Sequence, residues 1–439
     1  MADATATAPP AAAPAPHLDA STDDPAARPQ VTLLSGHHRR AEQSHPWIYS
    51  NEIAMDAAAK ALAPGTLVTL RRADERPFGV AMFNPHTLLA ARLLDRDAAR
   101  AIGRRFFARH FERALRLRGR LYEAPYYRLV HAEADGLPGL VIDRFGEVLA
   151  VQANAAGMDR QETAIIEALQ ALLSPAAIVM RNDSPARALE GLPLETRIAA
   201  GTLAAPAEIE ENGARFEVDV MAGQKTGWFY DQRDNRAFVA RLAAGARVVD
   251  LYCYGGGFAV AAAKVGAETV LGIDRSEPAL ALAARSAAKN GVGQRCEFRR
   301  AEVFAETAAL AAAGERFDIT VADPPPFARS KKDVPAALRG YRKLASQAAQ
   351  ITVPGGVLFM ASCSHNVAAA DFAEAVRRGM ADAGRTGRIL RSAGAARRDQ
   401  RDLAALGPHQ FAGDRQAEAA AAGPGRAEER AEQVLADAR

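Results

Sequence analysis

The spacing of apolar residues changes along the chain, and each change predicts a different kind of element. Between residues 31 and 97, short apolar runs are separated by turn residues, which predicts a small β-rich domain. Phe107, Phe111 and Ala114 then recur at i, i+4 and i+7, so residues 100–120 are predicted to form a helix. From residue 126 to 193, strand-like and helix-like stretches alternate, which predicts a second small domain of α/β type.

The most informative pattern is VVDLYCYGGGFAVAAAKVGAETVLGID, residues 248–274. It predicts a buried strand at 248–251, a tight turn at the three glycines, a helix from 258 and a second strand at 269–273. Asp274 follows about 20 residues past the turn, where a parallel α/β sheet offers a carboxylate to a ribose. An adenosine-containing cofactor is therefore the first hypothesis.

Three further strands are predicted at 296–299, 317–322 and 357–361, with a helix at 347–353 before the last one. Each strand is followed by chemically unusual residues, AEVF, DPPPF and SCSH in turn. Because open α/β sheets bind ligands at the carboxyl ends of their strands, we expect the reaction to take place at this edge.

Length and composition bound the class of protein. A chain of 439 residues exceeds what one hydrophobic core usually serves, so two or three domains are expected. The sequence supports neither a membrane span nor a secretory signal, and a cytoplasmic location is expected. Cys253, Cys296 and Cys363 are too few for a disulfide framework and lack metal-ligand spacing, so no metal is expected and any special cysteine acts as a thiol.

Charge is unevenly placed along the chain. The net charge is only +3, but residues 31–128 contain 17 Arg or Lys against 9 Asp or Glu. A basic first third beside a nucleotide-binding unit indicates a polyanionic partner, while a genomic bias toward Arg codons is the alternative. Arg39, Arg40 and Trp47 combine basic and aromatic groups in a way that suits RNA, although Trp47 is equally well explained as a core residue.

The predicted helix at 100–120 adds a second basic feature. Arg109, Arg113, Arg116 and Arg120 recur at helical spacing on a face away from its phenylalanines. This ridge either contacts the RNA backbone or is a solvated charged face, which is the commoner meaning of such a run.

Two classes of adenosine cofactor compete for the glycine turn. Dinucleotide folds use G-x-G-x-x-G with a pyrophosphate at the helix N-terminus, and the contiguous glycines here do not match that spacing. S-adenosylmethionine carries no phosphate and needs a close backbone turn and acidic groups, which favours it as the cofactor. The candidate contacts in this unit are Asp250, Tyr254, Gly255, Gly257 and Asp274.

Two neighbouring segments supply the remaining cofactor candidates. Glu302 follows the third strand, where an acid can accept a hydrogen bond from an adenine amino group, but an acid at a helix N-cap would look the same. The loop GQKTGWFYDQRDNR, residues 223–236, is expected to lie across the cofactor, with Asp231 and Arg233 as polar contacts.

The segment Asp323-Pro324-Pro325-Pro326-Phe327 predicts a site for a planar base. Prolines hold the preceding carboxylate and the local carbonyls rigidly, and Phe327 can stack on or wall the base. Methylation of an amino group or ring nitrogen would need no more than this. Cys363 favours cytosine C5 instead, because a thiolate that adds to C6 turns C5 into a nucleophile, with Asp323 hydrogen-bonding or protonating N3. His365 is a candidate for orienting groups or removing the C5 proton.

Four ordered motifs, GQKTGWFYDQRDNR, DLYCYGGGFAV, DPPPFARS and ASCSH, make the chain similar to the ribosomal RNA large subunit methyltransferase I family, and HPWIYSNEI and HAEADGLPGL extend the likeness toward the N-terminus. The resemblance implies a Rossmann-like class I methyltransferase domain preceded by a β-rich PUA-type RNA-binding domain and a small central α/β domain. It also implies 5-methylcytosine formation in 23S ribosomal RNA with S-adenosylmethionine, with Cys363 as nucleophile and Asp323 as base-pocket acid. The family is often dimeric, so a homodimer is expected.

The resulting division is a disordered leader at 1–30, the PUA-type domain at 31–100, the central domain at 101–200, the methyltransferase domain at 201–393 and an atypical tail at 394–439. The tail lacks a strand pattern, with Val434 its one β-branched residue, so a helical or disordered segment is expected where the family closes its sheet. A non-catalytic RNA-binding protein with a defective C-terminus is the alternative that this departure leaves open.

Overall fold

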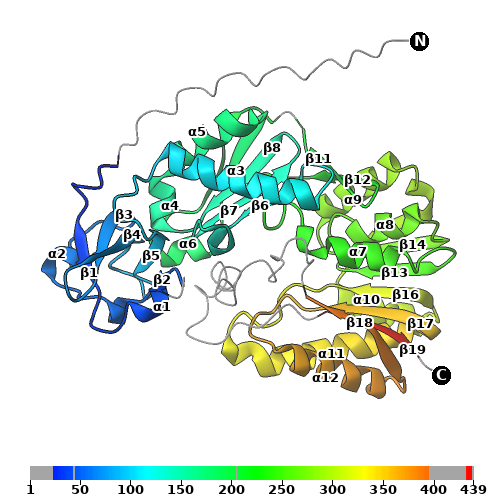
Figure 1. The fold of residues 1–439 in the computed structure, drawn as a ribbon. Helices are drawn as coiled ribbons and strands as arrows, with labels where there is room; N and C mark the ends of the chain where they lie inside the picture. Colours follow the sequence, from blue (N-terminus) through cyan, green and yellow to red (C-terminus); the bar gives the residue numbers. More distant parts are fainter. Residues whose placement is uncertain (1–22, 43–44, 204, 395–431, 438–439) are drawn as a thin grey trace, which may run out of the picture.

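In the computed structural model, the described residues are 23–42, 45–203, 205–394 and 432–437, with the side chains of Arg40 and of the last segment left aside. Three large sheets follow one another along the chain, and a two-stranded sheet lies between the second and the third in the sequence (Figure 1). No helix of the described ranges combines the length and the apolar character that crossing a membrane requires.

The first sheet has five short strands in the order β1-β3-β4-β5-β2, and all its pairings are antiparallel except that of β1 with β3. Its side chains enclose a core of their own around Leu33, Val68 and Phe83. The elements here are β1 (Gln30–Thr32), α1 (Arg39–Glu42), β2 (Trp47–Ile48), α2 (Ala57–Lys60), β3 (Thr66–Arg71), β4 (Pro77–Phe83) and β5 (Ala91–Asp95).

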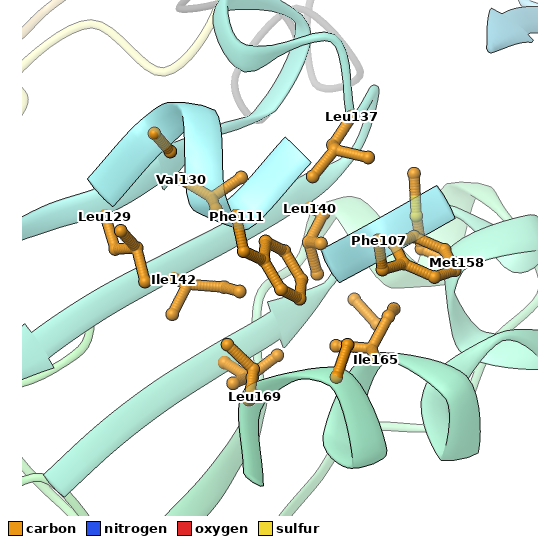
Figure 2. Close-up of a cluster of buried hydrophobic side chains, with 14 of the residues drawn as sticks. Phe107, Phe111, Leu129, Val130, Leu137, Leu140, Ile142, Met158, Ile165 and Leu169 are labelled. Carbon is orange, nitrogen blue, oxygen red and sulfur yellow. The ribbon is translucent and has the colours of Figure 1, made fainter. Parts of the chain in front are cut away.

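The second sheet has the order β10-β9-β8-β7-β6, in which only β8 and β9 are parallel. The helix α3 covers it together with α5, and Phe107 and Phe111 of α3 point into the shared core with Ile165 and Leu169 (Figure 2). The elements are α3 (Arg104–Leu121), β6 (Tyr126–His131), β7 (Leu140–Phe145), β8 (Val148–Ala153), α4 (Ala156–Arg160), α5 (Glu162–Leu173), β9 (Ala177–Asn182), α6 (Ala186–Leu189) and β10 (Glu195–Gly201).

A hairpin of β11 and β12 leads to the third sheet, which has seven strands in the order β15-β14-β13-β16-β17-β19-β18. The first five are parallel, and β19 runs antiparallel to both of its neighbours. The strands are β11 (Ala207–Glu211), β12 (Ala214–Val218), β13 (Arg247–Leu251), β14 (Thr269–Asp274), β15 (Cys296–Arg300), β16 (Phe317–Ala322), β17 (Thr352–Ala361), β18 (Gly387–Ala393) and β19 (Glu432–Asp437).

Helices cover both faces of this sheet. Val248 of β13 packs with α7 and α8 on one face, and its neighbour Val249 packs with α10, α11 and α12 on the other. Because successive side chains point to opposite faces and both faces are buried, the strand reads as a continuous apolar run. The helices are α7 (Arg233–Ala240), α8 (Gly257–Lys264), α9 (Glu277–Lys289), α10 (Val303–Ala312), α11 (Val334–Ile351) and α12 (Ala369–Asp382).

Three expectations from the sequence need correction. The helix predicted at 347–353 is the end of α11, which begins at Val334 and ends at Ile351, and the last two residues of the predicted range belong to β17 instead. The tail is not strandless either, because Glu432–Asp437 forms β19 between β17 and β18. Backbone pairing on both sides supplies what this segment lacks in β propensity. The expected loss of the closing strand is therefore wrong.

The predicted disorder at 1–30 is also wrong at its end, because Arg28 is buried and pairs with Asp23, and β1 begins at Gln30. Residues 1–22 of the predicted leader, and 395–431 and 438–439 of the tail, lie outside the described residues.

Candidate active site

The predicted site residues converge at the carboxyl edge of the third sheet. The strand β13 lies between β14 and β16, so the chain order reverses there, which is where open α/β sheets bind ligands. Asp250, Asp274 and Asp323 lie in or directly after these three strands. The sequence-based expectation that these carboxylates share one edge is therefore met by the topology.

Asp250 is the most deeply buried acid at this edge. Its Oδ2 accepts a hydrogen bond from the backbone N–H of Ala259 at 3.0 Å, while its buried Oδ1 has no hydrogen-bond partner among the described residues. Burial raises the pKa of Asp250 to about 8, and the nearby Asp323 and Asp274 add to the rise. An unpartnered buried acceptor of this kind suits a ligand that brings a donor or a positive charge.

The glycine turn places backbone where a ligand can approach it. Gly256 takes a φ of +77° at the start of α8, and a Cβ there would lie 2.9 Å from the Cβ of Ala283. A Cβ on Gly255 would meet only Trp228, at 3.7 Å, so the space beside Gly255 is open. Gly257 instead makes room for Arg236, whose Cδ would lie 2.9 Å from an added Cβ. Of the two glycines predicted to contact the cofactor, Gly255 therefore has open space beside it and Gly257 makes room for Arg236. Gly256, which was predicted only as part of the turn, is the residue with the positive φ.

Asp274 and Glu302 already serve the backbone. Asp274 accepts hydrogen bonds from the N–H groups of Tyr254 and Ser276, at 3.0 and 2.8 Å, which fixes its carboxylate at the end of β14. Glu302 is exposed and caps α10 by accepting from Ala305 N at 2.8 Å. The N-cap interpretation of Glu302 therefore holds, and a contact with adenine stays a prediction.

The loop at 223–236 is fastened by one buried acid. Glu211, at the end of β11, forms ion pairs with Arg233 and Arg236, at 3.2 and 2.6 Å, and accepts from Trp228 Nε1. Burial alone would raise the pKa of Glu211, but Arg236 and Arg233 hold it below its usual value.

This use of Arg233 corrects its predicted contact with the cofactor. Its guanidinium is buried over the rings of Tyr122 and Tyr230. It donates to the carbonyl of Tyr126 in β6, so it faces the second sheet. Asp231 lies 3.9 Å from Lys225 within the loop. The hydroxyl of Tyr254 accepts from Gln224 N and donates to Gly227 O, so Tyr254 ties the loop to the glycine turn.

Cys363, after β17, contacts the turn that Asp323 begins after β16. The thiol of Cys363 donates to the carbonyl of Pro324 at 3.6 Å, which places the sulfur on the Asp323-Pro324 turn. Gln232 Nε2 donates to Asp323 Oδ2 at 3.0 Å, and Asn235 Nδ2 donates to Gln232 Oε1 at 2.8 Å. Sequence reasoning missed Gln232, although its position inside the DQRDNR motif was a usable signal.

A network of three hydroxyl groups connects the segment after β17 with the segment after β16. Tyr341 of α11 is fully buried, and its hydroxyl lies 2.9 Å from Ser362 Oγ and 2.8 Å from Ser364 Oγ. Ser364 also accepts from Ala328 N at 3.1 Å, just after the proline turn. Both neighbours of Cys363 are therefore tied to α11 through Tyr341, and Ser364 also to the segment after the prolines.

Phe327 packs against α11, and its predicted contact with a base stays a prediction. Its ring packs 4.7 Å from that of Tyr341, and the missing side chain of Gly340 leaves room for it, since a Cβ there would lie 3.0 Å away. Pro324 is buried and Pro325 is exposed, so of the two only Pro325 can present its ring to a substrate from the surface.

The other cysteines and the more distant candidates behave differently. Burial raises the pKa of Cys253 well above its usual value and that of Cys296 to about 11, so both are poor thiolates. His365 is exposed. Within the described residues, no cluster of His, Cys, Asp and Glu could hold a metal ion.

The predicted RNA contacts of the first sheet divide. Arg39 is exposed at the start of α1, and the side chain of Arg40 lies outside the described residues. Trp47 is buried, and its Nε1 donates to Glu133 Oε1 at 3.0 Å. The expectation that Trp47 stacks on RNA is therefore replaced by the alternative, a packed residue that joins the first two sheets.

The site fits S-adenosylmethionine on two counts. Asp250 Oδ1 is a buried acceptor with no partner among the described residues, and in the turn that follows β13 the space beside Gly255 is open. The sequence of the turn around Gly256 lacks the G-x-G-x-x-G pattern that binds a pyrophosphate, in agreement with a cofactor that carries no phosphate.

Comparisons with known proteins agree with this geometry. Residues 167–382 match the model of an S-adenosylmethionine-dependent methyltransferase family, and residues 31–96 match that of a PUA-like domain. A solved protein from Streptococcus mutans, described as an S-adenosylmethionine-dependent methyltransferase, shares the fold with a TM-score of 0.71 at 17% identity, over 93% of this chain and all of the other. A methyltransferase solved in complex with SAH gives a TM-score of 0.72 at 18% identity, over 93% and 99% of the two chains.

Sequence relatives are closer. The Ribosomal RNA large subunit methyltransferase I of Shewanella denitrificans is 37% identical over 340 residues, which are 76% of this chain and 85% of the relative. That of Klebsiella pneumoniae is 36% identical over 363 residues, or 81% and 90%. The predicted fold class and the predicted cofactor, S-adenosylmethionine, are thereby confirmed. The chain belongs to the ribosomal RNA large subunit methyltransferase I family.

Proposed function

We propose that this protein methylates carbon 5 of a cytosine in the RNA of the large ribosomal subunit, the 23S RNA in bacteria, through a covalent adduct with Cys363. The substrate follows from the names of its relatives, which are large subunit RNA methyltransferases. The observation that carries the mechanism is the 3.6 Å contact between Cys363 Sγ and the carbonyl of Pro324. It supports a thiol on the turn that begins with Asp323, which is predicted to hold a base.

The reaction requires these two side chains in sequence. The thiolate of Cys363 adds to C6 of cytosine. The π electrons of the C5–C6 bond shift into the C4–C5 bond and those of the C4–N3 bond shift onto N3, which Asp323 hydrogen-bonds or protonates. C5 then bonds to the methyl carbon, whose bond to the sulfonium sulfur breaks. Loss of the C5 proton to a base expels the thiolate and restores the double bond. When bound, S-adenosylmethionine supplies the electrophilic methyl group.

The chain's own residues would prepare the cofactor and the base. Asp250 and Asp274 would accept hydrogen bonds from the cofactor, with backbone approach at Gly255. Phe327 and Pro325 would border the base. Gln232 would fix the orientation of the Asp323 carboxyl group. The hydroxyl of Tyr341 would hold Ser362 and Ser364, and with them the backbone on either side of Cys363.

The remaining predictions belong with this proposal. We propose domain boundaries near residues 30, 100 and 200, which is supported by β1 beginning at Gln30 and β10 ending at Gly201. The boundary at 393 is not supported in the same way, because β19 lies beyond it and belongs to the third sheet. A homodimer and a cytoplasmic location follow from the resemblance and the composition, and sedimentation of the purified protein tests the first. The alternative of a non-catalytic RNA-binding protein rested on a missing strand, and β19 removes that reason.

Product analysis tests the proposal. Ribosomal RNA from cells lacking the protein is incubated with the protein and S-adenosylmethionine, digested to nucleosides and examined by mass spectrometry with chromatographic separation of the isomers. We expect 5-methylcytidine, absent with Cys363→Ala. A product methylated at the amino group or at N3, formed equally by Cys363→Ala, would instead establish the nitrogen methyltransferase that Asp323 and the prolines alone could support.

A further inference from the structure

The helix α3 carries a stripe of exposed arginines that the proposed reaction does not use. Seven arginines and one glutamate occur between Arg104 and Leu121. Five of them are exposed and recur on one face, and this set, here called the α3 ridge, is Arg105, Arg109, Arg113, Arg116 and Arg120. At 1.5 Å per residue, the ridge is about 22 Å long.

The opposite face of α3 is fully committed to the fold. Phe106, Phe107 and Phe111 are buried in the core of the second sheet (Figure 2), and Arg118 forms a buried bidentate pair with Asp135 at 2.8 and 2.9 Å. The fold therefore buries Arg118 as a structural residue, and Arg113 donates to the carbonyl of Asp135 at 3.3 Å. The α3 ridge lies on the side that faces away from this core.

Three of the five arginines in the α3 ridge have no counter-charge or hydrogen-bond acceptor within the described residues. Among the described residues, no ion pair or hydrogen bond involves the side chain of Arg109, Arg116 or Arg120. Arg105 and Arg109, and likewise Arg116 and Arg120, are like charges at i, i+4, an arrangement that destabilises a helix. A ridge kept for solubility alone would be expected to alternate in sign, so the repeated positive charge indicates an anionic ligand.

The ridge leads to the catalytic edge. Tyr122, the C-cap of α3, lies under the guanidinium of Arg233, with 4.6 Å between the guanidinium carbon and the ring centroid. The residue that precedes Arg233 in the chain is Gln232, which donates to Asp323. In Figure 1, α3 lies along the outside of the second sheet and its C-terminal end points toward the third sheet. The N-terminal end packs on the first sheet, since Phe106 shares a core with Val80 and Leu94.

We propose that the α3 ridge binds the phosphate backbone of the RNA substrate and guides the strand from the first domain to the cytosine at Asp323 and Cys363. The proposal rests on the proposed function for the class of substrate, and adds the surface that holds it. Arginine spacing of one or two helical turns allows successive contacts with phosphates along one strand.

The test is the salt dependence of binding to transcribed 23S ribosomal RNA, measured by filter binding without S-adenosylmethionine. The variant Arg109→Gln/Arg116→Gln/Arg120→Gln removes three charges that make no internal contact. The control Arg247→Gln/Lys264→Gln/Arg316→Gln removes three exposed charges, two of them at the amino ends of β13 and β16. We expect the slope of log affinity against log salt to fall by about 2 to 3 for the ridge variant, and little for the control.

Equal slopes for the ridge variant and the unaltered protein, or equal losses in both variants, would overturn the proposal. So would normal binding of naked RNA combined with weaker binding of intact large subunits, which would assign the ridge to a protein partner. If the triple variant fails to fold, ultraviolet crosslinking of the unaltered protein to the RNA decides: crosslinks in residues 104–121 support the proposal, and crosslinks confined to other segments contradict it. Because no methyl transfer occurs in these assays, their failure is distinct from failure of the cytosine-C5 assignment.

Discussion

Gln232 Nε2 donates a hydrogen bond to Asp323 Oδ2 at 3.0 Å, and this contact joins the loop before α7 to the turn after β16. Both amides of the relay are buried, and Asn235 fixes the orientation of Gln232 by donating to its Oε1. The carboxyl group that is proposed to act on N3 of cytosine is therefore positioned by a segment some ninety residues earlier in the chain.

Gln232→Ala is expected to lower kcat by about 10- to 100-fold, because a hydrogen bond to a charged group is worth roughly 1.5–3 kcal/mol. Asn235→Ala acts one step further away and should lower kcat less. Gln224→Ala, in the same loop but exposed, is the matched control and should leave kcat unchanged. Steady-state kinetics separate the effects, and a rise in the KM for S-adenosylmethionine with unchanged kcat would show that Gln232 does not position Asp323.

Asp250 makes the stability of the unliganded protein depend on pH. Its pKa is raised to about 8 in the fold, so between pH 4 and 8 the folded protein holds a proton that the unfolded chain has lost. This contribution is complete below pH 4 and declines as pH rises, by up to about 1.4 kcal/mol per pH unit. In denaturant unfolding, the unaltered protein should lose stability relative to Asp250→Asn as pH rises from 4 to 8. A constant difference across this range would contradict the buried, protonated state.

Gly255 and Gly256 are expected to fail in different ways when changed to alanine. Gly256→Ala must adopt φ +77° and crowd Ala283, so it should destabilise the fold by at least about 1–2 kcal/mol. Gly255→Ala has ordinary φ and meets only Trp228, so the melting temperature should be unchanged while S-adenosylmethionine binding weakens. Calorimetry and thermal unfolding measure the two effects. Full cofactor affinity in a stable Gly255→Ala protein would remove Gly255 from the site.

The positions of the strands at the site were predictable, because apolar runs and the turn residues after them mark each parallel strand. Asp250, Asp323 and Cys363 were found in this way, since each lies in or directly after such a run. The partners of these residues were not. Gln232 reaches Asp323 across the fold, and Arg233 turns toward Tyr122 and Tyr230, which no local pattern reveals.

The strand β19 was hidden for a different reason. Its residues have little intrinsic β propensity, and their conformation comes from pairing with β17 on one side and β18 on the other. The burial of Trp47 was equally open in the sequence, because the carboxylate that accepts its indole N–H, that of Glu133, belongs to a segment 86 residues later.

Glu211 is expected to be the most sensitive charged residue of the loop anchor. Glu211→Gln leaves the buried guanidinium groups of Arg233 and Arg236 without their counter-charge, which should cost about 3–5 kcal/mol. The control Glu374→Gln breaks an exposed pair with Arg377 and Arg378 and should have little effect. Denaturant unfolding compares them, and similar stabilities for the two variants would contradict the anchoring role of Glu211.

The covalent role of Cys363 is tested most directly by trapping the adduct. RNA that carries 5-fluorocytosine at the target position cannot lose fluorine from C5, so the bond between Cys363 and C6 should persist after methyl transfer. With S-adenosylmethionine present, we expect a denaturation-resistant protein–RNA complex that carries one methyl group, maps to Cys363 by mass spectrometry and is absent with Cys363→Ala. Methylation of unmodified RNA by Cys363→Ala at the normal rate, with no adduct from the unaltered protein, would contradict the account.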